Sequence, residues 1–125
     1  MTVYSVLADA IRLRIDNDPD LTLPVYDNPL DAVQVPCVMV LAGDITPASF
    51  AGHWMHELRV NCLALRADTE GGIELADRLA MIVSEAAATL TSAAFLGASR
   101  PQTFTISGVD YLGRECAVTI TQRCQ

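Results

Sequence analysis

The stretch from residue 57 to residue 90 places the strongest constraint on how this chain can fold. In residues 57–64, the apolar Leu58, Val60, Cys62 and Ala64 alternate with the polar Glu57, Arg59 and Asn61, as expected of a strand that is half-buried. From about residue 69 to residue 90 the apolar spacing becomes helical, and one wide stripe contains Ile73, Ala76, Leu79, Ala80, Val83, Ala87 and Leu90. A helix of that length would extend roughly 33 Å. We therefore expect a long helix that covers one face of a sheet.

The flanking segments predict a second helix and further strands. Residues 3–15 have apolar side chains at helical spacing, with Thr2 as the N-cap. Residues 32–43 are typical of a strand covered on both faces, and a short extended piece is expected near residues 25–26. We expect a turn region over 91–101. A final hairpin is expected over 102–122, with a turn at 110–113 and with Phe104 and Ile106 facing Cys116, Val118 and Ile120.

These elements predict a single α+β domain over residues 1–125, in the order α-β-β-α-β-β. Its sheet would be mainly antiparallel, with four to five strands packed by one long helix and an N-terminal helix. With half of the residues apolar and 18% charged, we expect a well-packed globule and not a disordered chain.

Composition and charge exclude several classes of function. The longest apolar runs are much shorter than the roughly 20 residues that span a bilayer. The first residues lack the features of a signal peptide, so we expect a soluble protein that is made in the cytoplasm. A net charge of -7 argues against wrapping nucleic acid through its phosphates. The chain contains no Lys, which excludes any mechanism that needs a lysine.

The glycine pair Gly71–Gly72, between a strand and a helix, raises the question of a phosphate site. It matches neither the Walker loop nor the dinucleotide fingerprint. Asp68, Glu70 and Glu74 surround the expected helix start, where they would repel a phosphate but suit the positive end of the helix dipole. We therefore expect a capped helix, with Asp68 or Thr69 as N-cap, and no nucleotide.

No metal, cofactor or catalytic residue is expected. His53, His56 and Glu57 lie close together in sequence, but no third ligand is apparent on another element, so surface or interface histidines are the better interpretation. The four cysteines, Cys37, Cys62, Cys116 and Cys124, show no metal or redox spacing. In a cytoplasmic protein we expect reduced, mostly buried thiols.

Residues 44–57 are predicted to form a long loop that carries the large apolar side chains of Phe50, Trp54 and Met55. Two interpretations remain open: these side chains fold back as a small satellite core, or they anchor a partner protein. On the adjoining strand, Arg59 and Arg66 could pair with acidic groups of a neighbouring subunit.

Taken together, the N-terminal amphipathic helix, the segment HELRVNCLALRADTEGGIELADRLAMIVSEA and the terminal FTISGVDYLGRECAVTITQR resemble the tail terminator proteins of long-tailed bacteriophages. The likeness lies in the order of the elements, the length and the general pattern of residue types, and it extends over nearly the whole chain. It implies a homo-hexameric ring that caps the tail tube and joins it to the head connector, with the tube and connector proteins as partners. It also implies that DNA passes through the lumen without sequence-specific binding, and that the protein sits at the head-proximal end of the virion tail, with no membrane contact.

Two alternatives remain. One is another head-tail connector, the stopper beneath the portal, for which we expect a barrel richer in strands. The other is a small α+β ligand-binding or enzymatic domain, which would need a pocket with convergent polar groups.

Overall fold

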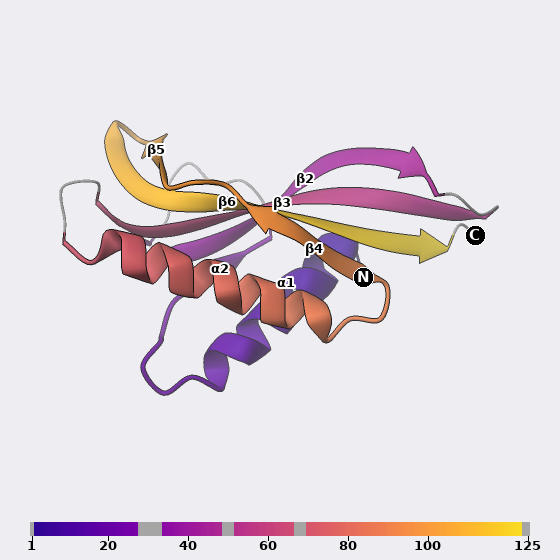
Figure 1. Ribbon diagram of the computed structural model, residues 1–125, viewed down its shortest axis with the longest axis horizontal. Coiled ribbons are helices and arrows are strands. Elements are labelled where there is room, and N and C mark those ends of the chain that lie inside the picture. The colour runs from indigo at the N-terminus through magenta and orange to yellow at the C-terminus, as the bar shows by residue number, and fades with distance from the viewer. Residues whose placement is uncertain (1, 28–33, 49–51, 67–69, 124–125) are drawn as a thin grey trace.

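The computed structural model describes residues 2–27, 34–48, 52–66 and 70–123. In chain order its elements are α1 (Val3–Asp16), β1 (Val25–Tyr26), β2 (Cys37–Pro47), β3 (His53–Arg66), α2 (Gly72–Ala88), β4 (Ala93–Ala98), β5 (Gln102–Ile106) and β6 (Val109–Arg123). The strands form one sheet, and both helices lie on the same face of it (Figure 1). Neither helix is both long enough and apolar enough to cross a membrane within the described part of the chain.

The sheet is mainly antiparallel, as the sequence predicts. Its strand order is β1-β2-β3-β6-β4, and β5 also pairs with β6. Only the short β1 runs parallel to its neighbour, β2. The α+β class is thus confirmed, but the sheet has six strands instead of four to five, and the order is α-β-β-β-α-β-β-β.

The central pair is β3 with β6, which remain paired from Arg66 and Tyr111 at one end to His53 and Arg123 at the other. The first part of β6 pairs with β5 and its later part with β4. One long strand therefore has two shorter neighbours in succession along the same side.

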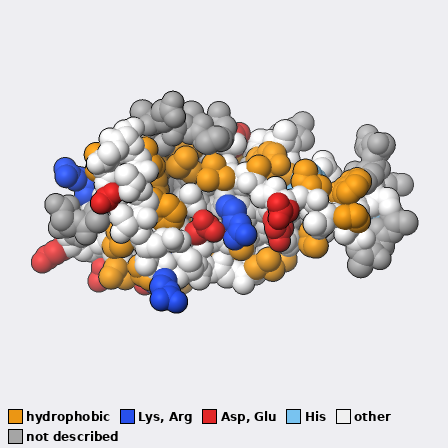
Figure 2. Space-filling model, turned by 90° about the horizontal axis from the view of Figure 1, so that it is seen from above, with side chains coloured by type: hydrophobic (Ala, Val, Ile, Leu, Met, Phe, Trp, Pro, Cys, Tyr) orange, Lys and Arg blue, Asp and Glu red, His pale blue; other side chains and the backbone are white. Residues whose placement is uncertain are grey.

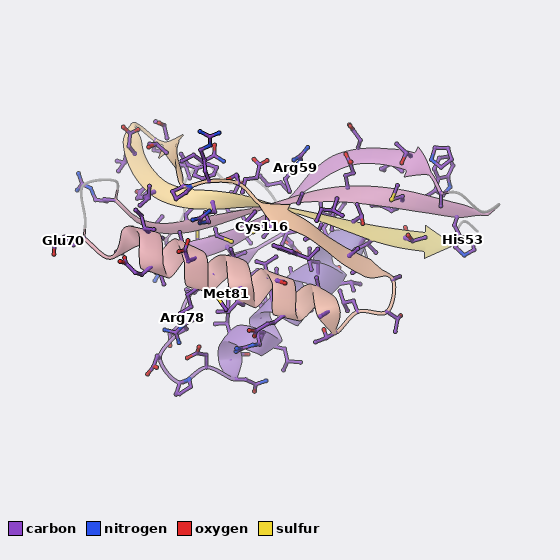
Figure 3. All side chains as sticks on the ribbon, in the orientation of Figure 1. His53, Arg59, Glu70, Arg78, Met81 and Cys116 are labelled. Atoms are coloured by element: carbon purple, nitrogen blue, oxygen red, sulfur yellow. The ribbon has the colours of Figure 1, made fainter. Side chains whose placement is uncertain are left out.

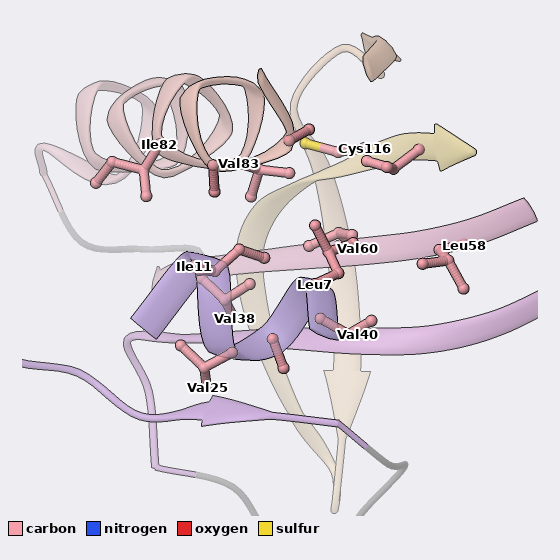
Figure 4. Close-up of a cluster of buried hydrophobic side chains, with 14 of the residues drawn as sticks. Leu7, Ile11, Val25, Val38, Val40, Leu58, Val60, Ile82, Val83 and Cys116 are labelled. Atoms are coloured by element: carbon pink, nitrogen blue, oxygen red, sulfur yellow. The ribbon is translucent and has the colours of Figure 1, made fainter. Parts of the chain in front are cut away.

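Helix α1 begins as the sequence predicts. The Thr2 side chain accepts a hydrogen bond from the backbone N–H of Ser5, and the Ser5 side chain accepts one from the N–H of Thr2. This reciprocal capping box satisfies two backbone donors that the first helical turn leaves without intrahelical partners. Behind it, Leu7 and Ile11 are fully buried against the sheet (Figure 4).

Helix α2 is shorter than expected at both ends, since it spans Gly72–Ala88. Its N-cap is Gly71, which has a left-handed backbone (φ 81°) and makes no side-chain capping bond. The expected caps, Asp68 and Thr69, lie outside the described residues. The predicted burial of Ile73 is wrong, because this side chain is 50% exposed. In Figure 1, β4 lies along the C-terminal part of α2, and the first turn of the helix lies beyond the end of that strand.

The main core lies between the helices and the sheet. It includes the expected contacts of α2 with the central strands, and its members include Leu58, Val60, Leu79, Val83, Val118 and Ile120. A smaller cluster of Cys37, Met39 and Leu63 packs elsewhere, with Phe104 and Ile106 among its partly buried neighbours.

The position of Phe104 and Ile106 corrects the predicted hairpin. Phe104 pairs with Tyr111 and Ile106 with Val109, so neither faces the core residues of β6 as expected. The turn is formed by Ser107 and Gly108, whose φ angles are 52° and 79°. A two-residue turn with both φ angles positive matches the twist of paired strands, and the chain therefore turns at 107–108 instead of at the predicted 110–113.

Candidate subunit and partner interfaces

Three strands continue past the helices as an arm, formed by residues 45–47 of β2, 53–56 of β3 and 120–123 of β6 (Figure 1). The predicted loop over 44–57 is therefore wrong for residues 44–47 and 53–57, which are strand, whereas the described residues 48 and 52 lie outside the strands. Pairing on both sides of β3 supplies backbone hydrogen bonds that outweigh the loop-like local composition. Residues 49–51, with Phe50 among them, lie outside the described part of the chain.

The arm exposes apolar side chains. Trp54 is 43% exposed and Ile45 52% exposed. Ile45 lies opposite His56, and His56 opposite Ile120, so these side chains share the sheet face that carries the main core. Trp54 belongs to neither hydrophobic cluster of the described residues. Its exposure favours an anchor for a partner over a satellite core.

The other predicted interface residues are not gathered around Trp54. Met55 follows it in β3 and therefore points to the opposite face of the arm. Arg59 lies near the middle of the sheet, on the face away from the helices (Figure 3). Arg66 ends β3, twelve residues beyond Trp54, which in a strand corresponds to a separation of about 40 Å. A single contact patch cannot contain all of them.

Arg59 is held by an ion pair within its own subunit. Its Nη1 lies 3.3 Å from Oε1 of Glu115 on the neighbouring strand β6. Both side chains are partly exposed, so the pair contributes little to stability. Figure 2 shows this face, where acidic and basic side chains lie side by side near the middle, between hydrophobic patches. The face is therefore mixed in charge and has no basic stripe.

The two histidines of the arm do not converge. They are three residues apart in β3, so successive alternation places His53 and His56 on opposite faces. His53 lies near the far end of the arm (Figure 3). Within the described residues, no three His, Cys, Asp or Glu side chains are grouped so that they could hold a metal ion. The Nδ1 atom of His56 is buried and has no hydrogen-bond partner among the described residues.

Two open hollows lie along β4. The larger, about 570 Å³, is lined by one imidazole, several hydroxyl groups and small side chains, from His53, Thr91, Ser92, Ala93, Ala94, Thr119 and Thr121. The smaller, about 200 Å³, places Leu96 beside Glu57 and Arg59. The larger hollow offers hydrogen-bonding groups without a carboxylate among its described lining residues. Such a surface suits contact with another polypeptide more than acid–base chemistry.

Strand β4 is the feature that sequence reasoning missed, because residues 91–101 were expected to form a turn region. Two features of the sequence could have indicated it. Phe95 and Leu96 lie within a short apolar run bounded by Ser residues, and residues 86–99 contain no charged side chain. No family model and no curated protein matches this chain. Its surfaces are therefore the basis for inferring what it does.

Proposed function

We propose that this chain is a tail terminator of long-tailed bacteriophages, a structural protein that assembles into a ring on the end of the tail tube. The observation that carries the proposal is the arm, which extends past the helices and exposes Trp54 and Ile45 away from both hydrophobic clusters. A terminator needs a surface for its ring neighbours and a second surface for the tube or the connector. A projecting arm with an aromatic anchor supplies one of them.

The charge distribution supports a ring through which DNA passes without being held. The chain carries a net charge of -7. Among the described residues, ion pairs with carboxylates of the same subunit engage the side chains of Arg12, Arg14, Arg59, Arg78 and Arg114. Paired guanidinium groups in an acidic chain do not create the positive field that retains phosphates. The partners are then proteins: further copies of this chain, in a hexamer if it follows the family that it resembles, with the tube and connector proteins.

The two helices, of 14 and 17 residues, favour a terminator over a stopper, for which we expect a barrel richer in strands. The open hollows do not favour the small-molecule alternative, since a ligand site encloses most of its ligand among convergent polar groups.

The proposal is tested by measuring mass and shape in the same sample. Size-exclusion chromatography with light scattering should give a multiple of the subunit mass, and negative-stain microscopy should show rings. Added to the phage's polymerising tube protein, the rings should stop tube growth, which a stopper would not do. A monomer at every concentration that leaves tube length unchanged would contradict the proposal.

A further inference from the structure

The sheet has a free backbone edge on each side. Strand β4 pairs with β6 and with no other strand among the described residues. At the opposite side, β2 pairs with β1 only at Val38 and Met39, which leaves the edge of residues 40–47 open over the described chain. In Figure 1, β4 is the edge nearest the viewer. An open edge presents N–H and C=O groups that another strand can satisfy.

The β4 edge is short and has a bulge between Phe95 and Gly97, but it lacks the side-chain protection that monomeric proteins usually give to a free strand. Charged side chains or proline on an edge normally prevent pairing with other chains, yet Ala93–Ala98 contains neither. Leu96 is 62% exposed. The Ser92 carbonyl accepts a hydrogen bond from the N–H of Thr121 in β6. The backbone N–H and C=O groups of successive residues point alternately to the two sides of a strand. The N–H and C=O groups of Phe95 are therefore directed to the open side.

The β2 edge is also poor in charged side chains, but it ends at Pro47, which has no backbone N–H to donate. Residues 32–56 contain one charged side chain, Asp44, which lies at a bulge between Ala42 and Ile45. Both open edges therefore come from segments almost without charge, in a chain whose net charge is -7. Two copies that meet through these edges avoid most of the repulsion that their acidic surfaces would cause.

The strand directions are compatible with pairing between copies. Each adjacent pair from β2 through β3 and β6 to β4 is antiparallel. It follows that β4 runs opposite to β2. A second copy placed beside the first in the same orientation would bring its β2 antiparallel to β4, with the helices of both copies on the same face of the joined sheet. Two different edges then meet at every contact, which is a head-to-tail geometry, and such a geometry gives a ring when the rotation between neighbouring copies closes.

We propose that β4 of one subunit pairs with β2 of the next copy of this chain, so that the sheet continues from subunit to subunit around the ring. The inference rests on the proposed ring function and specifies its subunit contact. The hollows beside β4 then receive side chains from the neighbour, while the exposed Trp54 near the end of the arm stays available for the tube or the connector.

Cross-linking tests this contact directly. Ala94 lies opposite Thr119, and Thr46 lies opposite Met55, which itself lies opposite Thr121, so positions 94 and 46 share one sheet face. We would combine Ala94→Cys with Thr46→Cys in a Cys124→Ser background and treat the assembled protein with a short bis-maleimide. The double variant should give a ladder of covalent multimers on a denaturing gel, up to the full ring. Each single variant should run as a monomer on this gel. The matched control, Ala94→Cys with Thr22→Cys, should do the same, because Thr22 is exposed but lies in the loop after α1 and not on the β2 edge.

The outcomes separate this inference from the proposed function. Rings in the microscope without a ladder would overturn the edge pairing and leave the ring intact. Dimers from Ala94→Cys alone would also overturn it, because they indicate β4 paired with β4. A monomer by light scattering would overturn both. As a second measurement, Leu96→Lys should reduce the ring fraction at least tenfold with an unchanged circular dichroism spectrum, and an undiminished ring fraction would contradict the pairing.

Discussion

The thiols of Cys62 and Cys116 meet beneath α2, with their sulfur atoms 4.0 Å apart and both side chains fully buried. Cys62 lies directly opposite Arg114 on β6, so the two cysteines are diagonal neighbours across the central strand pair. The contact with Cys116, together with burial, raises the pKa of Cys62 well above its ordinary value. Burial also raises the pKa of Cys37 to about 11. These cysteines behave as small core side chains.

The first prediction is that these thiols are unreactive in the folded protein. Only a thiolate attacks common thiol reagents, and it must be accessible. In a Cys124→Ser variant at pH 8, a maleimide should label none of Cys37, Cys62 and Cys116 under native conditions. All three should be labelled in guanidinium, as counted by mass spectrometry. Fast native labelling of any of them would contradict the buried positions.

The second prediction concerns alkaline pH. With the pKa of Cys37 at about 11 when folded and an ordinary value of 9.0, the unfolded chain loses this proton first as the pH rises. The contribution of Cys37 to stability is therefore complete below about pH 9 and falls between pH 9 and 11. Urea unfolding at pH 8 and pH 10.5 should show this loss, and Cys37→Val should make it smaller. An equal loss of stability in the unsubstituted protein and in Cys37→Val would show that other titrating groups cause it.

The third prediction compares two apolar residues of α2 that the sequence pattern treats alike. Leu79 is fully buried, whereas Ile73 is 50% exposed. Leu79→Ala should lower the free energy of unfolding by about 2–5 kcal/mol, because it leaves a cavity under the helix. Ile73→Ala should cost less than about 1 kcal/mol, since much of that side chain already meets water. Urea denaturation of the two variants measures the difference. Similar losses in the free energy of unfolding would contradict the packing of α2 on the sheet.

A fourth prediction uses two glycines with different neighbours. A Cβ at Gly113 would lie 2.2 Å from the backbone oxygen of Cys62, so β3 and β6 would have to separate. A Cβ at Gly72 would meet the Cδ2 atom of Leu112 at 3.0 Å, the end of a side chain that can move. Gly113→Ala should cost roughly 1–3 kcal/mol, whereas Gly72→Ala should be near neutral, because alanine also favours the helix. Comparable melting temperatures for the two variants would argue against the close strand approach.

The fifth prediction separates the two interpretations of Trp54. If it anchors a partner, Trp54→Ala should leave the melting of the subunit nearly unchanged, since the side chain is 43% exposed. Its contact should weaken by about 2 kcal/mol or more, roughly 30-fold in affinity. Pull-down with tail tubes or binding to the connector measures that loss. The control is Met81→Ala, which removes an exposed side chain from α2 and should leave binding intact. Unfolding at a clearly lower temperature would instead support a satellite core.

The sequence by itself determined the elements whose evidence is local. The N-cap at Thr2, the helical stripe around Leu79 and the alternation that begins at Glu57 each arise from contacts within a few residues or from one face meeting a core. They predicted α1, α2 and β3, and with them the α+β class. The free energy that favours these elements comes from periodic burial, which a single chain segment reveals.

The tertiary structure decided the features that depend on distant partners. Ala93–Ala98 becomes a strand because the second part of β6 offers it open backbone groups, while its own small residues carry a weak pattern. Residues 45–47 and 53–56 become strands of the arm for the same reason, since β3 finds partners on both sides. The separation of Trp54 from Arg66 follows from the length of β3. Backbone hydrogen bonding has no side-chain signature, so the open edges of β2 and β4, which the proposed ring uses, emerge only when the sheet is assembled.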